Sequence, residues 1–141
     1  MKELLTPLIQ TEIIIRLLAS PAGQNLRGML HNNTSVYKIA NAVNWFKENY
    51  AESITMDMLA AKVHMNTSTF RQLFKKVTSM SPLQYLKTIR LQNARNFMLS
   101  EDIDAASAAI RVGYESISQF SREYKRYFGT SPKQDVKNMR I

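Results

Sequence analysis

Cysteine is absent from this chain of 141 residues, and histidine occurs only twice. Without cysteine there can be no disulfide bond, thiolate zinc site, iron–sulfur cluster or cysteine nucleophile. Glycine and proline number four each, so residues that interrupt helices are scarce. No apolar stretch approaches the roughly 20 residues that a membrane-spanning helix requires, and no secretory signal pattern follows Met1. We therefore expect a cytoplasmic protein with no cofactor, no metal and no membrane partner.

Sequence signatures of common enzyme sites are also missing. The chain has no G-x-x-x-x-G-K-[ST] phosphate loop, no G-x-G-x-x-G dinucleotide motif, no H-E-x-x-H metal motif and no G-x-S-x-G nucleophile turn. The acidic pair Glu101-Asp102 has no visible catalytic partner in the sequence. We predict that the chain is not an enzyme.

What the sequence does contain is an excess of positive charge, which is unevenly distributed. Lys and Arg total 19 against 11 Asp and Glu, a formal net charge of +8. Residues 1–53 carry 5 basic and 4 acidic side chains, net +1, whereas residues 54–141 carry 14 and 7, net +7. Basic surfaces attract polyanions such as nucleic acid or anionic membranes. Any such partner is expected to bind the second part of the chain.

Apolar residues recur three and four positions apart, and alternating β-branched strands are absent, which predicts an all-α protein. Capping residues mark several helix starts. The caps predicted in this way are Thr34 or Ser35, Thr55, Asn66 and Asp104. Nine helices are predicted, near residues 3–19, 22–31, 35–50, 55–63, 67–78, 82–99, 105–112, 117–128 and 132–139.

The second part of the chain contains an internal repeat. The pattern F-x-x-x-[FY]-K-[KR]-x-x-[SG]-x-S-P begins at Phe70 and again at Phe120. Upstream the register shifts by one residue, with Ala60 matching Ala109, so one residue is inserted in the second turn. Each copy therefore predicts a short helix, a tight turn and a second helix with aromatic residues four positions apart.

A short helix, a tight turn and a longer helix form the helix-turn-helix layout. The two units, at about residues 55–78 and 105–128, are expected to be joined by a helix near 82–99, roughly 27 Å long at 1.5 Å per residue. That length suits two reading helices, 67–78 and 117–128, that enter successive major grooves about 34 Å apart.

The turn of each unit is expected to need left-handed backbone. Gly113 suits this position in the second copy, because glycine has no Cβ that would clash. His64 occupies the matching position in the first copy. Histidine tolerates the left-handed region less well than glycine, so we expect a slightly strained first turn.

These motifs resemble the signature of the AraC/XylS family of bacterial transcription regulators. The likeness rests on Val112-Gly113-Tyr114-Glu115-Ser116, residues 119–126, Phe128-Gly129 and Ser131-Pro132 in the second copy, and on Leu59-Ala60, Phe70, Phe74-Lys75 and Ser81-Pro82-Leu83 in the first. It extends over residues 35–141, the expected DNA-binding domain. The resemblance implies two helix-turn-helix subdomains bridged by a long helix, and promoter binding as the activity. It also implies RNA polymerase as a partner in the full-length context.

Residues 1–34 resemble the segment that joins a sensor domain to the DNA-binding domain in one branch of that family. We expect a helical connector here, a sensor domain missing from this chain, and a monomer. The predicted helix 3–19 has an apolar face wider than a surface helix needs. It either packs on helices 22–31 and 35–50, or docks against the sensor domain or a second chain.

The resemblance also assigns the residues that contact DNA, since the exposed N-terminal face of the second helix meets base edges in this layout. The expected base-contacting residues are Ser68, Arg71, Gln72, Ser118, Ser121 and Arg122. The expected phosphate-contacting residues are Thr67, Lys75, Lys76, Lys125 and Arg126. Arginine can bridge two acceptors on guanine, and glutamine suits adenine.

Two questions stay open at this level. Arg90 and Arg95, on the connecting helix, either touch phosphate or form internal salt bridges. For the whole chain, the prediction is sequence-specific binding of double-stranded promoter DNA in transcription regulation. The alternative is a non-specific module whose basic face meets RNA or an acidic protein.

Overall fold

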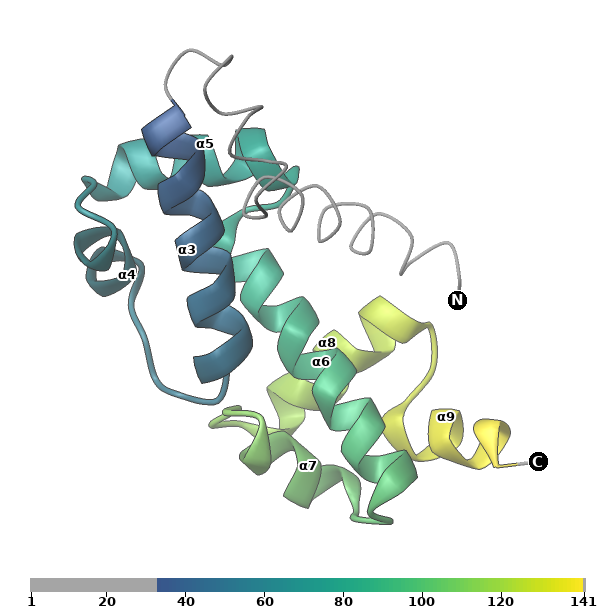
Figure 1. Cartoon of the computed structure of the whole chain (residues 1–141). Helices are drawn as coiled ribbons and strands as arrows, with labels where there is room; N and C mark the ends of the chain where they lie inside the picture. The colour runs from purple at the N-terminus through teal and green to yellow at the C-terminus, as the bar shows by residue number, and fades with distance from the viewer. Residues whose placement is uncertain (1–32, 141) are drawn as a thin grey trace. The chain divides into compact units, whose positions relative to one another are not determined.

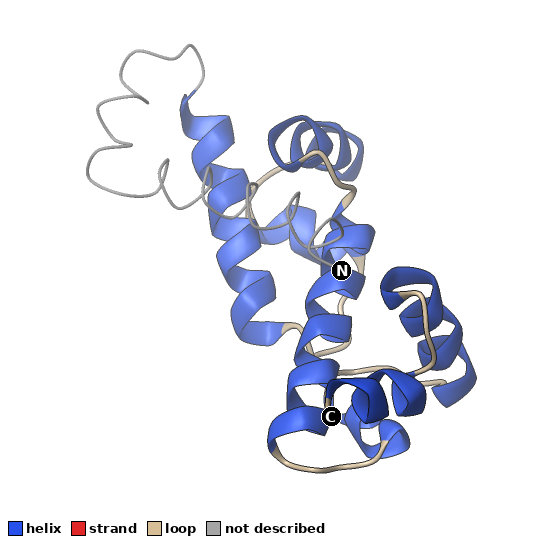
Figure 2. Cartoon of the chain, turned by 90° about the vertical axis from the view of Figure 1, so that its right-hand side faces the viewer, coloured by secondary structure: helices blue, strands red, loops and turns tan. Residues whose placement is uncertain are grey.

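The computed structural model describes residues 33–140, and this part of the chain is helical without any strand (Figures 1 and 2). Its seven helices are α3 (Asn33–Asn49), α4 (Met56–Lys62), α5 (Thr67–Thr78), α6 (Pro82–Ser100), α7 (Ala105–Arg111), α8 (Ile117–Phe128) and α9 (Pro132–Met139). The all-α prediction is confirmed for these residues, and each predicted end lies within about two positions of the observed one. The predicted helices 3–19 and 22–31 lie outside the described residues.

Side-chain caps explain where most of these helices begin. Thr55, Asn66 and Asp104 each accept a hydrogen bond from the backbone N–H three residues ahead, at 3.1, 2.8 and 2.7 Å. Each bond satisfies a donor that the first helical turn leaves unpaired, worth about 1 kcal/mol. The predicted cap at Thr34 or Ser35 is wrong, because α3 begins at Asn33 and both residues lie inside its first turn.

The chain divides into two compact units. Of the described residues, 33–48 and 54–85 belong to unit 1, and 49–53 and 86–140 belong to unit 2. Helix α6 begins in unit 1 and continues into unit 2. Each helix-turn-helix motif falls in its own unit, α4 and α5 in the first and α7 and α8 in the second.

An aromatic cluster forms the core of unit 1. The ring of Phe46 on α3 lies edge-on to that of Phe74 on α5, with centroids 5.9 Å apart. Tyr85, in the first turn of α6, contacts both rings at 5.8 and 5.6 Å, and Phe70 contacts Phe74 at 5.6 Å. All four side chains are fully buried. Aromatic pairs add about 0.5–1.5 kcal/mol each beyond buried area, so this cluster fixes which face of α5 remains exposed.

The core of unit 2 follows the same plan on α8. Ring centroids of Tyr114 and Phe120 lie 5.2 Å apart, those of Phe120 and Tyr124 5.6 Å, and those of Tyr124 and Phe128 4.5 Å. These rings pack with buried aliphatic residues of α6 and α7, such as Leu91. Phe120 and Tyr124 are both fully buried, so the aromatic residues four positions apart in the second copy face the core.

A buried ion pair holds α9 in unit 2. The carboxylate of Asp135, 2% exposed, lies 3.1 Å from Nε of Arg95 on α6. Asp135 also accepts a hydrogen bond of 2.5 Å from the Tyr124 hydroxyl. The Arg95 guanidinium stacks 4.5 Å from the Phe128 ring centre. Three helices therefore meet at one carboxylate, and for Arg95 the internal salt bridge is the correct one of the two predicted roles.

Candidate nucleic-acid interface

The two helix-turn-helix motifs share their turn geometry. After α4, the Met65 N–H donates to the carbonyl of Ala60 at 3.0 Å, and after α7 the Tyr114 N–H donates to the carbonyl of Ala109 at 3.0 Å. Ala60 and Ala109 are almost fully buried, which allows the second helix to pack closely. The residue inserted in the second copy lies after this hydrogen bond. One residue, the cap Asn66, separates Met65 from α5, whereas two residues, Glu115 and the cap Ser116, separate Tyr114 from α8. The two copies of the sequence repeat therefore have the same turn structure.

Each turn contains a left-handed residue at the predicted position. The φ angle is 59° at His64 and 100° at Gly113. At Gly113 a Cβ would lie 2.7 Å from the carbonyl oxygen of Ala51, so glycine is required by space as well as by backbone conformation. His64 adopts the same region with a side chain, which costs about 1–2 kcal/mol. Lys38 of α3 donates to the His64 carbonyl at 3.4 Å and supports this turn.

Helix α5 exposes the predicted contact residues on one side. Ser68, Arg71 and Gln72 are exposed, as are Lys75 and Lys76. No acidic side chain occurs on this helix. The exposed side is therefore cationic and rich in hydrogen-bond donors, as contact with phosphates and base edges requires.

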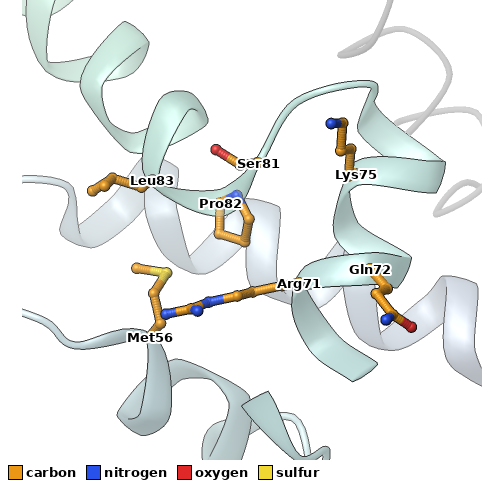
Figure 3. A pocket seen from close by; sticks show the side chains of 7 residues that line it. All are labelled: Met56, Arg71, Gln72, Lys75, Ser81, Pro82 and Leu83. Carbon is orange, nitrogen blue, oxygen red and sulfur yellow. The ribbon is translucent and has the colours of Figure 1, made fainter. Parts of the chain in front are cut away.

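Arg71 lies in a groove on the surface of unit 1. The groove has a volume of about 510 Å³, and Met56 and Pro82 belong to its lining. Figure 3 shows Arg71 extending from α5 toward Met56, whereas Gln72 points away from Arg71. The two adjacent side chains therefore reach different parts of the surface.

Helix α8 exposes a similar but smaller set of polar side chains. Ser118, Arg122, Lys125 and Arg126 are exposed, whereas Ser121 is half-buried. Among the predicted base-contacting residues of this helix, Arg122 has the longest side chain and no partner within the part of the chain that is described. The half-buried Ser121 has less reach than its counterpart Arg71 in the first copy.

Thr67 differs from the other predicted phosphate contacts. Its hydroxyl donates a hydrogen bond of 2.6 Å to the carboxylate of Asp57 on α4. A hydroxyl engaged in this way has no proton left to donate to a phosphate oxygen, because it carries a single O–H. Any contact from Thr67 to an anion must therefore come from its backbone N–H.

Helix α8 carries one acidic residue, Glu123, whose charge is fully compensated. Glu123 accepts hydrogen bonds from the Tyr114 hydroxyl at 2.5 Å and Gln119 at 3.2 Å, and it pairs with Lys87 at 2.9 Å. Burial favours a higher pKa for Glu123, but these donors outweigh burial and lower the pKa. Glu123 is therefore an anchor between α8 and α6, and its charge does not oppose an approaching polyanion.

Arg90 is also an internal residue. Its Nε and Nη2 donate to the carbonyls of Tyr50 and Glu52 at 2.6 and 3.0 Å, and its guanidinium lies 5.9 Å from the Tyr114 ring centre. Burial lowers the pKa of Arg90 from its ordinary value. Arg90 therefore has an internal role, but it acts through hydrogen bonds to carbonyls that hold the segment 49–53 and not through the predicted salt bridge.

The distribution of unpaired cations is the main electrostatic feature of the described residues. Lysines and arginines on the remaining helices interact with a carboxylate, a carbonyl, an aromatic ring or another group of the protein, as Arg111 does with Glu101 at 2.8 Å. The cations without such a partner among residues 33–140 are Arg71, Lys75, Lys76, Arg122, Lys125, Arg126, Lys133 and Lys137. They lie on α5, α8 and α9 alone. The sequence patterns gave no indication of Lys133 and Lys137, because they assigned α9 no role.

The described residues include no group of three or more histidine, cysteine, aspartate or glutamate side chains arranged to hold a metal ion. Within the same residues, none of the helices has the length and hydropathy that crossing a membrane requires.

Comparison with known proteins decides which family has this architecture. A family model described as a helix-turn-helix domain matches residues 59–138, more than half of the chain. The solved DNA-binding domain of AdpA, in complex with a target DNA, superposes with a TM-score of 0.70 and 29% identity, covering 73% of this chain and 93% of that one. The chain belongs to the AraC/XylS family. The family resemblance predicted from the repeat is confirmed.

Two further proteins are similar to this chain. A probable AraC family transcriptional regulator from Rhodopseudomonas palustris has the same fold, with a TM-score of 0.66, 22% identity and coverage of 72% of this chain and 96% of that one. The HTH-type transcriptional activator RhaS of Escherichia coli strain SE11 is 25% identical over 121 residues. This alignment includes 86% of the chain but only 43% of RhaS, so the chain spans less than half of that relative's length.

Proposed function

We propose that this chain binds double-stranded DNA sequence-specifically and thereby regulates transcription. The observation that carries the proposal is the restriction of unpaired cations, among residues 33–140, to α5, α8 and α9. Two of these helices are the second helices of helix-turn-helix motifs, the elements that enter the major groove in this layout. The AdpA domain, which is similar in sequence and fold, is solved with a target DNA.

Residue roles follow from side-chain length and chemistry. Arg71 and Arg122 are proposed to bridge acceptors on guanine, and Gln72 to pair with adenine. Ser68, Ser118 and the half-buried Ser121 make short or water-mediated base contacts. The cations proposed to hold phosphates are Lys75, Lys76, Lys125 and Arg126. Thr67 contributes through its backbone N–H.

The repeat supports a bipartite site. With one reading helix in each unit, a single chain supplies two contacts to successive major grooves, and we propose that it binds as a monomer. Because the curated relative RhaS is named as a transcriptional activator, we also propose RNA polymerase as a partner of the full-length protein. A protein with this function would work in the bacterial cytoplasm, where the promoter DNA lies.

Selection from a library of random duplexes tests the proposal and does not require the operator sequence to be known. We expect a defined motif whose enrichment persists near 150 mM salt. Arg122→Ala should abolish preference at one base pair, a loss of about 1–3 kcal/mol of discrimination. Lys76→Ala should weaken binding to every duplex equally and reduce the slope of log affinity against log salt by about 0.9.

Arg111→Ala is the matched control, because it removes one positive charge that Glu101 already pairs. This variant should keep both the selected motif and the salt slope. Equal and steeply salt-dependent binding of the wild type to all duplexes and to RNA would overturn the proposal in favour of a non-specific polyanion module.

A further inference from the structure

Helix α9 shares a groove with the start of α7 and with the first residue of α8. The groove has a volume of about 890 Å³, and Ile117, the first residue of α8, forms part of its wall. Lys133 and Lys137 of α9 line the same groove. Because residues four positions apart lie on one helix face, both lysines line one side of this groove, whose wall also includes Ala105 and Ala106 of α7.

The two lysines differ from the other charged residues around this groove. Arg140 is paired with Asp102 at 2.7 Å, and the carboxylate of Asp104 accepts the hydrogen bond that caps α7. Lys133 and Lys137 are both exposed and have no counter-charge among the described residues. Two like charges four positions apart on an exposed helix face repel by about 0.2–0.5 kcal/mol, and a phosphate bound beside them would remove this repulsion.

The first copy of the repeat has no equivalent pair. The residue that follows the shared Ser-Pro is Leu83 in the first copy and Lys133 in the second. Lys87 corresponds to Lys137 in the repeat, but its ammonium group is bound to Glu123 at 2.9 Å. The helix fold therefore does not require cations at these two positions.

We propose that α9 is a second DNA-backbone-binding element of unit 2, in which Lys133 and Lys137 hold phosphates that flank the base pairs read by α8. This inference rests on the proposed function. It adds two phosphate contacts to unit 2 that unit 1 lacks, so the half-site bound by unit 2 contributes more of the salt-dependent affinity.

The experiment compares the whole chain with its Lys133→Gln, Lys137→Gln double variant on the duplex selected by the wild type. Each lost phosphate contact should reduce the salt slope by about 0.9, so the double variant should lose about 1.8. Between 50 and 200 mM salt its affinity should then fall about twelvefold less than that of the wild type. The selected motif should be unchanged, since phosphate contacts carry no direct base information.

Three further measurements separate this role from a loss of structure. The Lys133→Arg, Lys137→Arg double variant should restore the wild-type slope, because it keeps both charges. Arg111→Gln, which removes a charge already paired with Glu101, should leave the slope unchanged. Hydroxyl-radical footprints should shorten at the end of the site bound by unit 2 in the glutamine variant alone.

An unchanged slope and footprint in the glutamine variant would overturn the inference about α9, even where the wild type binds its motif selectively. A wild type that selects no motif would instead overturn the proposed function. A slope lowered equally by Arg111→Gln would also contradict the inference, because general charge loss and not the placement of α9 would then explain the effect.

Discussion

Removal of the Asp135 carboxylate is the most informative test of how unit 2 is held together. Asp135→Ala leaves the Arg95 guanidinium, which is 9% exposed, without its counter-charge. It also removes the acceptor of the Tyr124 hydroxyl. Burial and this hydrogen bond to a carboxylate both raise the pKa of Tyr124, so the hydroxyl keeps its proton and remains a donor in need of an acceptor.

The expected cost follows from this geometry. Breaking a buried ion pair by removing one partner costs about 3–5 kcal/mol, because the other charge stays buried. The unsatisfied Tyr124 hydroxyl is part of the same network, so its penalty does not simply add. Domains of this size are stable by about 5–15 kcal/mol, so Asp135→Ala is expected to remove a large fraction of the stability.

Urea unfolding followed by circular dichroism measures the loss. Glu101→Ala is the control, because its pair with Arg111 has side chains 45–46% exposed and should be worth under about 1 kcal/mol. A combined replacement of Arg95 by Met, Asp135 by Leu and Tyr124 by Phe should recover most of the loss, since a buried polar network exchanged for apolar residues is often neutral and no hydroxyl then lacks its acceptor. An Asp135→Ala variant no less stable than Glu101→Ala would refute the argument.

Three further predictions concern the turns and the anchor of α8. Gly113→Ala should cost about 1–3 kcal/mol in thermal unfolding, because φ is 100° and a Cβ would meet the Ala51 carbonyl oxygen at 2.7 Å. Ser79 caps α5 at φ 65° and Gly129 caps α8 at φ 83°, with open space around Gly129. Ser79→Gly should therefore raise the unfolding free energy by up to about 1 kcal/mol, and Gly129→Ser should lower it by a similar amount. Changes of the same sign in the two variants would contradict this account of the caps. The hydrogen bonds to Glu123 lower the pKa of its carboxyl group in the folded state. Ionised Glu123 therefore stabilises the fold at neutral pH, and this contribution is lost as the pH falls through that pKa. Glu123→Gln should flatten the dependence of the urea midpoint on pH below about pH 5.

Helix positions and the repeat were predictable because their signals are local. Thr55, Asn66 and Asp104 cap the helices that follow them, and aromatic residues four apart face the core. The turn residues His64 and Gly113 were also predictable, since few residues tolerate left-handed backbone. The prediction of a cap at Thr34 or Ser35 was wrong because α3 starts earlier, at Asn33.

The roles of the arginines were not predictable in the same way. Arg90 donates to a carbonyl 40 positions away, and Arg95 pairs with a carboxylate 40 positions away. Nothing in the spacing of residues 82–99 distinguishes these arginines from the exposed Arg71 or Arg122. Their role depends on which acceptor the fold brings to each guanidinium, and that is a property of tertiary structure.

The pairing of individual cations also changes the meaning of the chain's net charge. A formal charge of +8 predicts attraction to polyanions but assigns it to no surface. Cations paired with a carboxylate contribute little to the field at a distance, because their charge is neutralised locally. Cations that no carboxylate neutralises release counterions when they meet phosphates. In residues 33–140 the cations without any partner lie on α5, α8 and α9, whereas Lys38, Lys62 and Arg90 contact only carbonyls or aromatic rings. The salt slope should therefore count the unpaired cations that reach phosphate rather than the total charge. A slope that fell equally on neutralising paired and unpaired cations would show that net charge alone drives binding.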